Sequence, residues 1–166
     1  MYIRRIELKD SELFLNMLKQ LDNETNNMMF EPGERKTTIR DMESNIINSV
    51  NSHSLILVAE ENGTIVGFLS AERGFANRIK HCAYIVIGIL KEYRGKRIGE
   101  SLFNEMERWA VENNITRLEL TVMTHNESAV NLYEKMGFKI EGTKEKSLIV
   151  NGKYVDEYYM GKILSE

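Results

Sequence analysis

Residues 85–102 read Ile-Val-Ile-Gly-Ile-Leu-Lys-Glu-Tyr-Arg-Gly-Lys-Arg-Ile-Gly-Glu-Ser-Leu. The apolar run 84–90 predicts a buried strand, and a short basic turn leads from it into a helix. Backbone N–H groups of such a turn point into one concavity, at the positive end of the helix dipole. This segment therefore predicts a diphosphate-binding site, with Arg94, Lys96 and Arg97 beside it.

The glycine spacing of this turn differs from two common phosphate-binding motifs. It is neither the Gly-x-x-x-x-Gly-Lys-Ser/Thr of a nucleotide P-loop nor the Gly-x-Gly-x-x-Gly of a dinucleotide fold. Taken alone, the segment also fits an ordinary strand-to-helix turn whose basic side chains are solvated.

A second segment, residues 126–138, reads Asn-Glu-Ser-Ala-Val-Asn-Leu-Tyr-Glu-Lys-Met-Gly-Phe. Together the two segments resemble the GNAT superfamily of acyl-CoA N-acyltransferases. The pyrophosphate loop of that family, Arg/Gln-x-x-Gly-x-Gly/Ala, is similar to residues 94–99. Its second signature, Asn-x-x-Ala-x-x-Leu-Tyr-x-x-x-Gly-Phe, is matched at Asn126, Ala129, Leu132, Tyr133, Gly137 and Phe138. The resemblance covers essentially the whole chain and is closest over residues 83–164.

Arg97 departs from the family pattern, which has the first glycine of a Gly-x-Gly pair at this position. The ligand donor there is a backbone N–H, which arginine also has. We expect a helix-starting turn to require a negative φ, so arginine is predicted to be tolerated. Its side chain would add one charge beside the diphosphate.

The composition is that of one soluble domain covering residues 1–166. Hydrophobic residues make up 42% and charged residues 28% of a chain long enough to bury a core. A net charge of −3 gives no support for nucleic acid or an anionic membrane as a partner, so neither is expected. The N-terminus has no apolar signal region, which predicts a cytoplasmic protein.

Cys82 is the single cysteine, so the chain has no intrachain disulfide and no cysteine-based metal site. No metal is expected. Cys82 is interpreted as a small apolar strand residue. His81 is expected to point to the opposite face of that strand, away from the thiol.

Apolar periodicity and turn signals predict the element order βααβββαβαββ. We expect a single-domain α/β fold, with a mixed, mostly antiparallel twisted sheet of about seven strands and helices on both faces. The family resemblance implies the same order. The expected elements are strand 2–8, helix 11–22, a helix capped by Thr37 or Thr38, hairpin 54–73, strand 84–90, helix 97–113, strand 117–123, helix 127–136 and a final hairpin around Asn151-Gly152.

The resemblance implies attack of a neutral amine on the thioester carbonyl of acetyl-CoA, the co-substrate. The diphosphate would lie on Arg94, Gly95, Lys96, Arg97, Ile98 and Gly99, and the pantetheine arm along an open strand edge. Gly88 suggests a bulge or a close backbone approach, with relief of core crowding as the alternative. The N–H near Ile89 would stabilise the oxyanion. Asn126 is expected to cap its helix and, with Ala129, to contact CoA.

Tyr133 is the expected general acid, because a phenol is protonated at neutral pH and can protonate the leaving thiolate. A half-buried aromatic side chain with a wet hydroxyl is the alternative. Many relatives have a glutamate on the strand before the diphosphate loop, but strand 83–90 has no carboxylate. Glu119 is therefore the candidate base, with Glu31, Glu34 or a chain of waters as alternatives.

The acceptor is expected to enter between residues 23–36 and residues 147–159. The first segment carries Met28, Met29 and Phe30. The second is predicted to present four alternating side chains on one face: Tyr154, Asp156, Tyr158 and Met160. Apolar walls with carboxylates suit a small cationic amine, although a self-packed loop and a cross-strand aromatic ladder fit the same pattern.

Two short comparisons favour a small-molecule acceptor. Residues 120–123 read Leu-Thr-Val-Met, where alanine-type ribosomal-protein N-terminal acetyltransferases usually have Leu-Glu-Val-Arg. Residues 119–122, 140–143 and 152–160 look like bacterial enzymes that acetylate free amino acids. We therefore expect a small-amine N-acetyltransferase, monomeric or homodimeric. A protein N-terminal acetyltransferase and a non-catalytic acyl-CoA-binding module are the alternatives.

Overall fold

One seven-stranded sheet organises the chain in a computed structural model that describes residues 1–165. The strand order is β1-β2-β3-β4-β5-β7-β6, and every neighbouring pair is antiparallel except β4 and β5. This confirms the predicted fold class and element order. The elements are β1 (Tyr2–Arg5), η1 (Leu8–Asp10), α1 (Ser11–Glu24), α2 (Ile39–Asn51), β2 (Leu55–Glu61), β3 (Thr64–Arg73), β4 (Cys82–Ile89), η2 (Lys91–Tyr93), α3 (Ile98–Glu112), β5 (Arg117–Met123), α4 (Glu127–Lys135), β6 (Lys139–Val150) and β7 (Lys153–Ile163).

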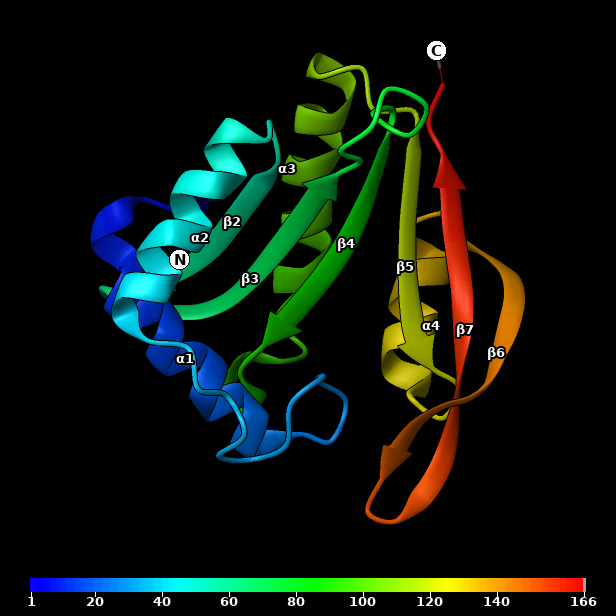
Figure 1. The fold of residues 1–166 in the computed structure, drawn as a ribbon, viewed down its shortest axis with the longest axis horizontal. Helices are drawn as coiled ribbons and strands as arrows, with labels where there is room; N and C mark the ends of the chain where they lie inside the picture. The colour runs from blue at the N-terminus through cyan, green and yellow to red at the C-terminus, as the bar shows by residue number, and fades with distance from the viewer. Residues whose placement is uncertain (166) are drawn as a thin grey trace.

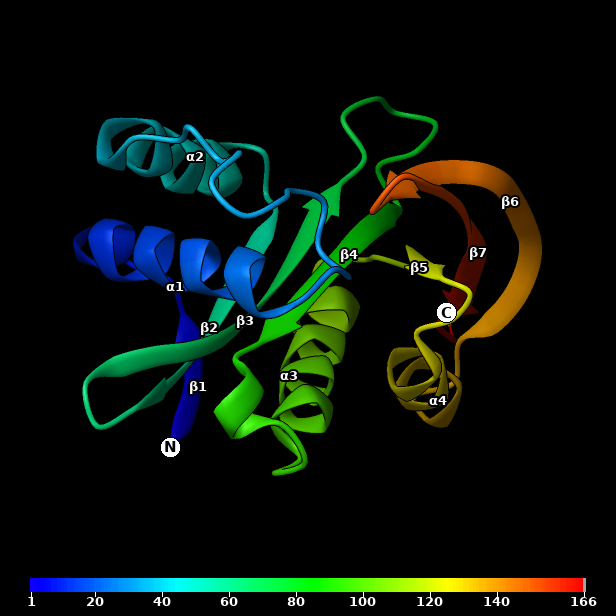
Figure 2. The ribbon, with the colours of Figure 1, turned by 90° about the horizontal axis from the view of Figure 1, so that it is seen from below.

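Helices cover both faces of the sheet, as Figure 2 shows: α1 and α2 lie on one face, and α3 and α4 on the other. Each face has its own hydrophobic cluster. The α1/α2 side buries residues such as Leu18, Leu21 and Phe68. On the α3/α4 side, the predicted apolar stripe of α3 is buried in full (Ile98, Leu102, Met106, Trp109 and Ala110). No helix within residues 1–165 is both long and apolar enough to cross a membrane.

The parallel pair β4 and β5 separates along its length. Only Cys82–Tyr84 of β4 pair with Arg117–Glu119 of β5. Beyond this point the two strands diverge and leave a gap in the middle of the sheet (Figure 1). The sheet is held together on either side of the gap, because β3 pairs with β4 up to Ile89 and β7 pairs with β5 up to Met123.

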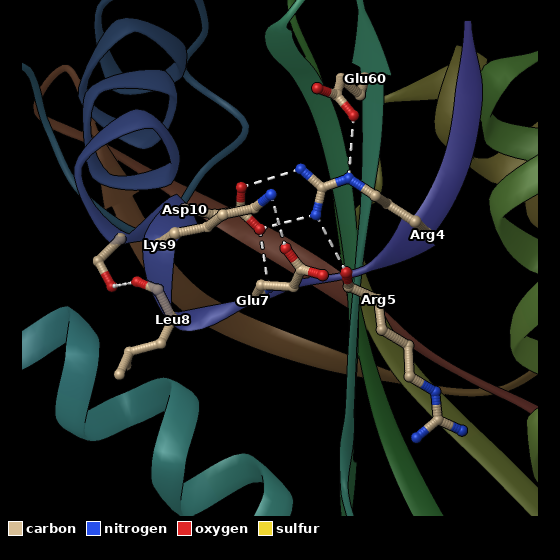
Figure 3. A network of polar contacts seen from close by, with 8 residues as sticks. Arg4, Arg5, Glu7, Leu8, Lys9, Asp10 and Glu60 are labelled. Carbon is tan, nitrogen blue, oxygen red and sulfur yellow. Dashed lines mark hydrogen bonds and ion pairs between the residues drawn. The ribbon is translucent and has the colours of Figure 1, made fainter.

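The first strand ends at Arg5, so its predicted extension to residue 8 is wrong. The cause is a polar network (Figure 3). Arg4 binds the buried Asp10 carboxylate through two hydrogen bonds of 2.7 and 2.9 Å and Glu60 of β2 through one of 2.9 Å. Asp10 also accepts the Glu7 N–H at 2.7 Å, which closes η1. The Arg4 guanidinium lowers the pKa of Asp10, so this turn keeps a charged anchor down to acidic pH.

The strand expected to be buried, β4, is half-buried and begins earlier than predicted. Ala83 and Ile85 are buried, whereas Tyr84 and Val86 are 39% and 37% exposed. One face of β4 is therefore partly open. An apolar run in the sequence cannot reveal this exposure. Thr38 caps α2 as expected, with Asp41 completing the capping box.

Candidate active site

A cavity of about 720 Å³ fills the gap between β4 and β5. One end is formed by the turn before α3 and the middle by the facing edges of β4, β5 and α4. The other end lies between residues 25–38 and the β6–β7 hairpin. The segments predicted to hold diphosphate, thioester and acceptor thus border one continuous space.

The turn before α3, predicted to bind diphosphate, forms one end of the cavity. Gly95 and Arg97 both have positive φ, +75° and +62°, on either side of Lys96. No side chain caps the first turn of α3, so its N–H groups have no side-chain acceptor there. Such alternation at a helix N-terminus is typical of the backbone nests that bind anions. Arg94, Gly95, Arg97, Ile98 and Gly99 all line the cavity.

One expectation about this turn needs correction. Arg97 is in the left-handed region, so the expected negative φ is wrong. The family glycine is therefore a conformational requirement that arginine meets at an energetic cost. Lys96 does not line the cavity; its Nζ lies 5.0 Å from the centre of the Tyr93 ring.

Replacing Arg97 with glycine is expected to raise the free energy of unfolding by about 1 kcal/mol, because glycine adopts positive φ without the Cβ penalty. Urea denaturation measures this change. Arg97→Ala is the matched control, since it removes the same charge and keeps the strained geometry. If the alanine variant is as stable as the glycine variant, strain at this position is not the cause.

The β4 edge that faces the gap carries unpaired backbone groups. Leu90 donates its N–H to Val66 of β3 at 2.9 Å. Alternation along an antiparallel ladder then turns the N–H and carbonyl of Ile89 toward the gap, where β5 does not pair. The Arg94 Nε donates to that Ile89 carbonyl at 3.1 Å. The N–H of Ile89 therefore faces the cavity.

Gly88 is explained by packing. A Cβ built there would lie 2.4 Å from Leu21 Cδ2 and 2.9 Å from Phe68 Cε1. Pairing of β4 with β3 is continuous through this position, so the bulge that we considered is absent. Relief of core crowding, the alternative interpretation, accounts for Gly88, although this residue also borders the cavity.

Tyr133 of α4 lines the cavity, although it is only 8% exposed. Its ring packs edge-on against Phe103, with centroids 5.8 Å apart, and against Phe138. Burial raises the pKa of Tyr133 above its ordinary value, with a smaller contribution from the nearby Tyr84. Its phenol therefore stays protonated well above neutral pH. Asn126 caps α4 as predicted, accepting the Ala129 N–H at 3.4 Å, and both residues line the cavity.

Sequence reasoning did not single out Tyr84. Its hydroxyl lies 2.7 Å from Thr121 Oγ1, joining β4 and β5 just beyond their last paired residues. Both side chains line the cavity. The only signal was a polar aromatic residue within the apolar run, which does not reveal the neighbouring strand.

The candidate bases are dispersed. Glu119 accepts a 2.7 Å hydrogen bond from Arg117, which also binds Glu141, and it does not line the large cavity. This position gives no support to Glu119 as the base. Glu31 borders a separate cavity of about 210 Å³, and Glu34 accepts the Glu31 N–H at 3.3 Å.

The cavity face of β7 is the opposite of the one predicted. Met160 is buried in the core and Tyr158 packs against it, whereas Glu157 lines the cavity. Glu157 is paired in register with Met123 of β5, so the odd-numbered residues share the face of the gap. A shift of one residue in strand register would exchange the two faces of β7. Only the pairing of β7 with β5 fixes which face lines the cavity.

Residues 25–38 form the remaining wall of the acceptor end. Met28, Met29 and Phe30 line the cavity, as does Arg35. Arg35 binds the buried Asp22 of α1 through two hydrogen bonds of 2.7 and 3.0 Å and stacks 4.7 Å from the Phe30 ring centre. This pair anchors an otherwise irregular segment to α1.

His81 precedes β4, so strand alternation does not apply to it. Its Nε2 lies 3.5 Å from Cys82 Sγ, contrary to the expected opposite orientation. Burial and the Glu119 charge raise the pKa of Cys82, which disfavours a thiolate.

Within residues 1–165, no three His, Cys, Asp or Glu side chains gather as a metal site.

The sequence pattern of the acetyltransferase (GNAT) family matches residues 15–138. The chain belongs to the GNAT family of acetyltransferases. It is therefore an acyltransferase, and the nest before α3 lies on the motif that suggested this family.

Three similar proteins illustrate the likeness. The L-amino acid N-acetyltransferase AaaT of Escherichia coli K12 is 35% identical over 111 residues, which cover 64% of this chain and 67% of that protein. A GNAT-family acetyltransferase from Streptococcus pneumoniae has a crystal structure with a TM-score of 0.94, at 32% identity and covering 98% and 99% of the two chains. A putative acetyltransferase from Salmonella typhimurium, yncA, determined with acetyl-CoA, has a TM-score of 0.90 at 17% identity, covering 100% of this chain and 95% of that one.

Proposed function

We propose that this GNAT protein transfers the acetyl group of acetyl-CoA directly to the primary amine of a small molecule, an amino acid or a similar amine. The observation that carries the proposal is the single cavity that runs from the anion-binding nest, past the open β4 edge, to an apolar pocket. Each part suits one part of the reactants: diphosphate, pantetheine with its thioester, and amine.

The nest at residues 94–99 is suited to the diphosphate because its N–H donors converge there and the helix dipole adds positive potential. The pantetheine amides would pair with the unpaired β4 edge as an added strand would. The N–H of Ile89 would then donate to the acyl oxygen, where negative charge develops. Tyr133 would give its proton to the departing thiolate.

A small-molecule acceptor is favoured by two observations. AaaT, which is named for activity on L-amino acids, is 35% identical over 111 residues. The acceptor end is bordered by the apolar side chains Met28, Phe30 and Leu148 with one carboxylate, Glu157. Such walls suit a compact amine with an apolar body.

Release of free thiol from acetyl-CoA tests the proposal. The purified protein is assayed with amino acids, polyamines, aminoglycosides and short N-terminal peptides, and acetyl-CoA binding is measured separately by calorimetry. We expect turnover with a free amino acid or another small amine. Turnover with peptides alone would contradict the small-molecule assignment, and binding without any turnover would favour an acyl-CoA-binding module.

A further inference from the structure

An amine acceptor is mostly protonated at neutral pH, so the acceptor end of the cavity needs a group that binds a cation and removes its proton. This requirement rests on the proposed function. Two carboxylates line the cavity, Glu100 and Glu157. Glu100 is ion-paired with Lys135 and lies in the first turn of α3, at the diphosphate end.

Glu157 is a carboxylate without a cation. In the part of the chain that the structure describes, no Lys, Arg or His nitrogen lies within ion-pair distance of it, and the Ser147 hydroxyl donates to its Oε1. Lys144 is its register partner on β6, yet makes no ion pair with it. The other cavity charge nearby, Arg35, is already neutralised by Asp22.

An irregularity in the last hairpin places the Ser147 hydroxyl beside Glu157. The register of β6 against β7 shifts between Lys144 and Leu148, and Lys146 has a positive φ of +49°. This irregular segment places the Ser147 hydroxyl on the Glu157 carboxylate. Ser147 therefore fixes one carboxylate oxygen and leaves the other available.

The surroundings of Glu157 strengthen its attraction for a cation. Met28, Met123 and Leu148 line the same cavity, and apolar walls lower the local dielectric constant. Glu157 is also on the same face as Tyr159, the register partner of Thr121, and lies two residues, about 7 Å, along β7 from it. A water molecule bound between the Glu157 carboxylate and this part of the cavity can span part of that distance.

We propose that Glu157 binds the ammonium group of the acceptor and takes its proton, directly or through one water. The freed nitrogen lone pair attacks the thioester carbonyl, which forms the C–N bond, and the C–S bond then breaks. The CoA thiolate takes the Tyr133 proton. The excess proton on the new amide nitrogen returns through water to the Tyr133 phenolate, and Glu157 releases its own proton to solvent.

Glu157→Gln tests this assignment because glutamine keeps the size of the side chain and an oxygen for the Ser147 hydroxyl. We expect kcat/KM for the amine to fall about a hundredfold at neutral pH, with acetyl-CoA affinity unchanged. The deficit should shrink as pH rises, because more of the amine then arrives already neutral. A purely structural role would not give this pH dependence.

Glu145→Gln is the matched control. Glu145 is an exposed residue of β6 in the same hairpin and does not line the cavity, so the same change of charge should leave the kinetics unaltered. A Glu157→Gln enzyme with the wild-type kcat/KM at every pH would overturn the inference while leaving the proposed function intact.

A binding measurement separates the inference from the proposed function. Calorimetry with n-hexylammonium, a cation with an apolar body, should show binding to the CoA-loaded wild-type protein that weakens at least tenfold in Glu157→Gln. Equal binding by both proteins, or none to the wild type, would overturn the role of Glu157. Absence of turnover with every amine would instead count against the proposed function.

Discussion

Replacing Tyr133 with phenylalanine is expected to lower kcat about a hundredfold, while the affinity for acetyl-CoA stays unchanged. The variant removes only the proton donor for the leaving thiolate. Phenylalanine keeps the edge-on packing against Phe103 and the tilted packing against Phe138, so the fold around α4 should persist. Steady-state kinetics with the accepted amine and calorimetry with acetyl-CoA measure the two effects separately.

The pH profile gives a second measure of Tyr133. Its raised pKa keeps the phenol protonated through the alkaline range. At any pH below about 10, loss of this proton should therefore not reduce the wild-type rate. Tyr2→Phe is the control, because Tyr2 is exposed on β1 and does not line the cavity. An unchanged kcat in Tyr133→Phe would remove Tyr133 as the general acid.

Asp22→Asn is expected to lower the free energy of unfolding by about 3 kcal/mol, because it leaves the Arg35 guanidinium largely buried without a counter-charge. Asp22 is 1% exposed and binds Arg35 through both carboxylate oxygens. Since Arg35 anchors residues 25–38, the same variant should raise the KM for the amine several-fold. Urea denaturation and amine kinetics are the two measurements.

The double variant Asp22→Asn/Arg35→Gln completes the cycle. Removing the cation as well should recover part of the lost stability, because two neutral amides can pair where a single charge cannot. The loss of stability in the double variant could instead equal the sum of the losses in the single variants Asp22→Asn and Arg35→Gln. That result would show that the ion pair does not couple the loop to α1.

The elements with strong local signals were predictable. Glycine and asparagine marked the hairpin turns, and the 3.6-residue period of α3 identified a buried stripe that the structure confirms. Thr38 and Asn126 were identified as caps because a short polar side chain satisfies free N–H groups at helix starts. These features depend on residues a few positions apart.

The cavity depends on contacts between distant segments, and its details were missed. Tyr84 meets Thr121 across a gap that neither strand encodes alone. Arg35 was not singled out, because its partner Asp22 lies 13 residues earlier on another element. Arg97 was expected at negative φ but has a positive one. The conformation of this turn is set by the direction in which the next helix must leave, and the local sequence does not show that direction.

The sequence by itself determined the order of the elements, the turn between β4 and α3 and the family, because each rests on periodicity or on a motif within one short segment. The tertiary structure alone decided which face of β7 meets the cavity, and so brought Glu157 to the cavity and left Glu119 with Arg117. The physical reason is that strand side chains alternate every residue. Which set faces a ligand is therefore fixed only by register against a neighbouring strand.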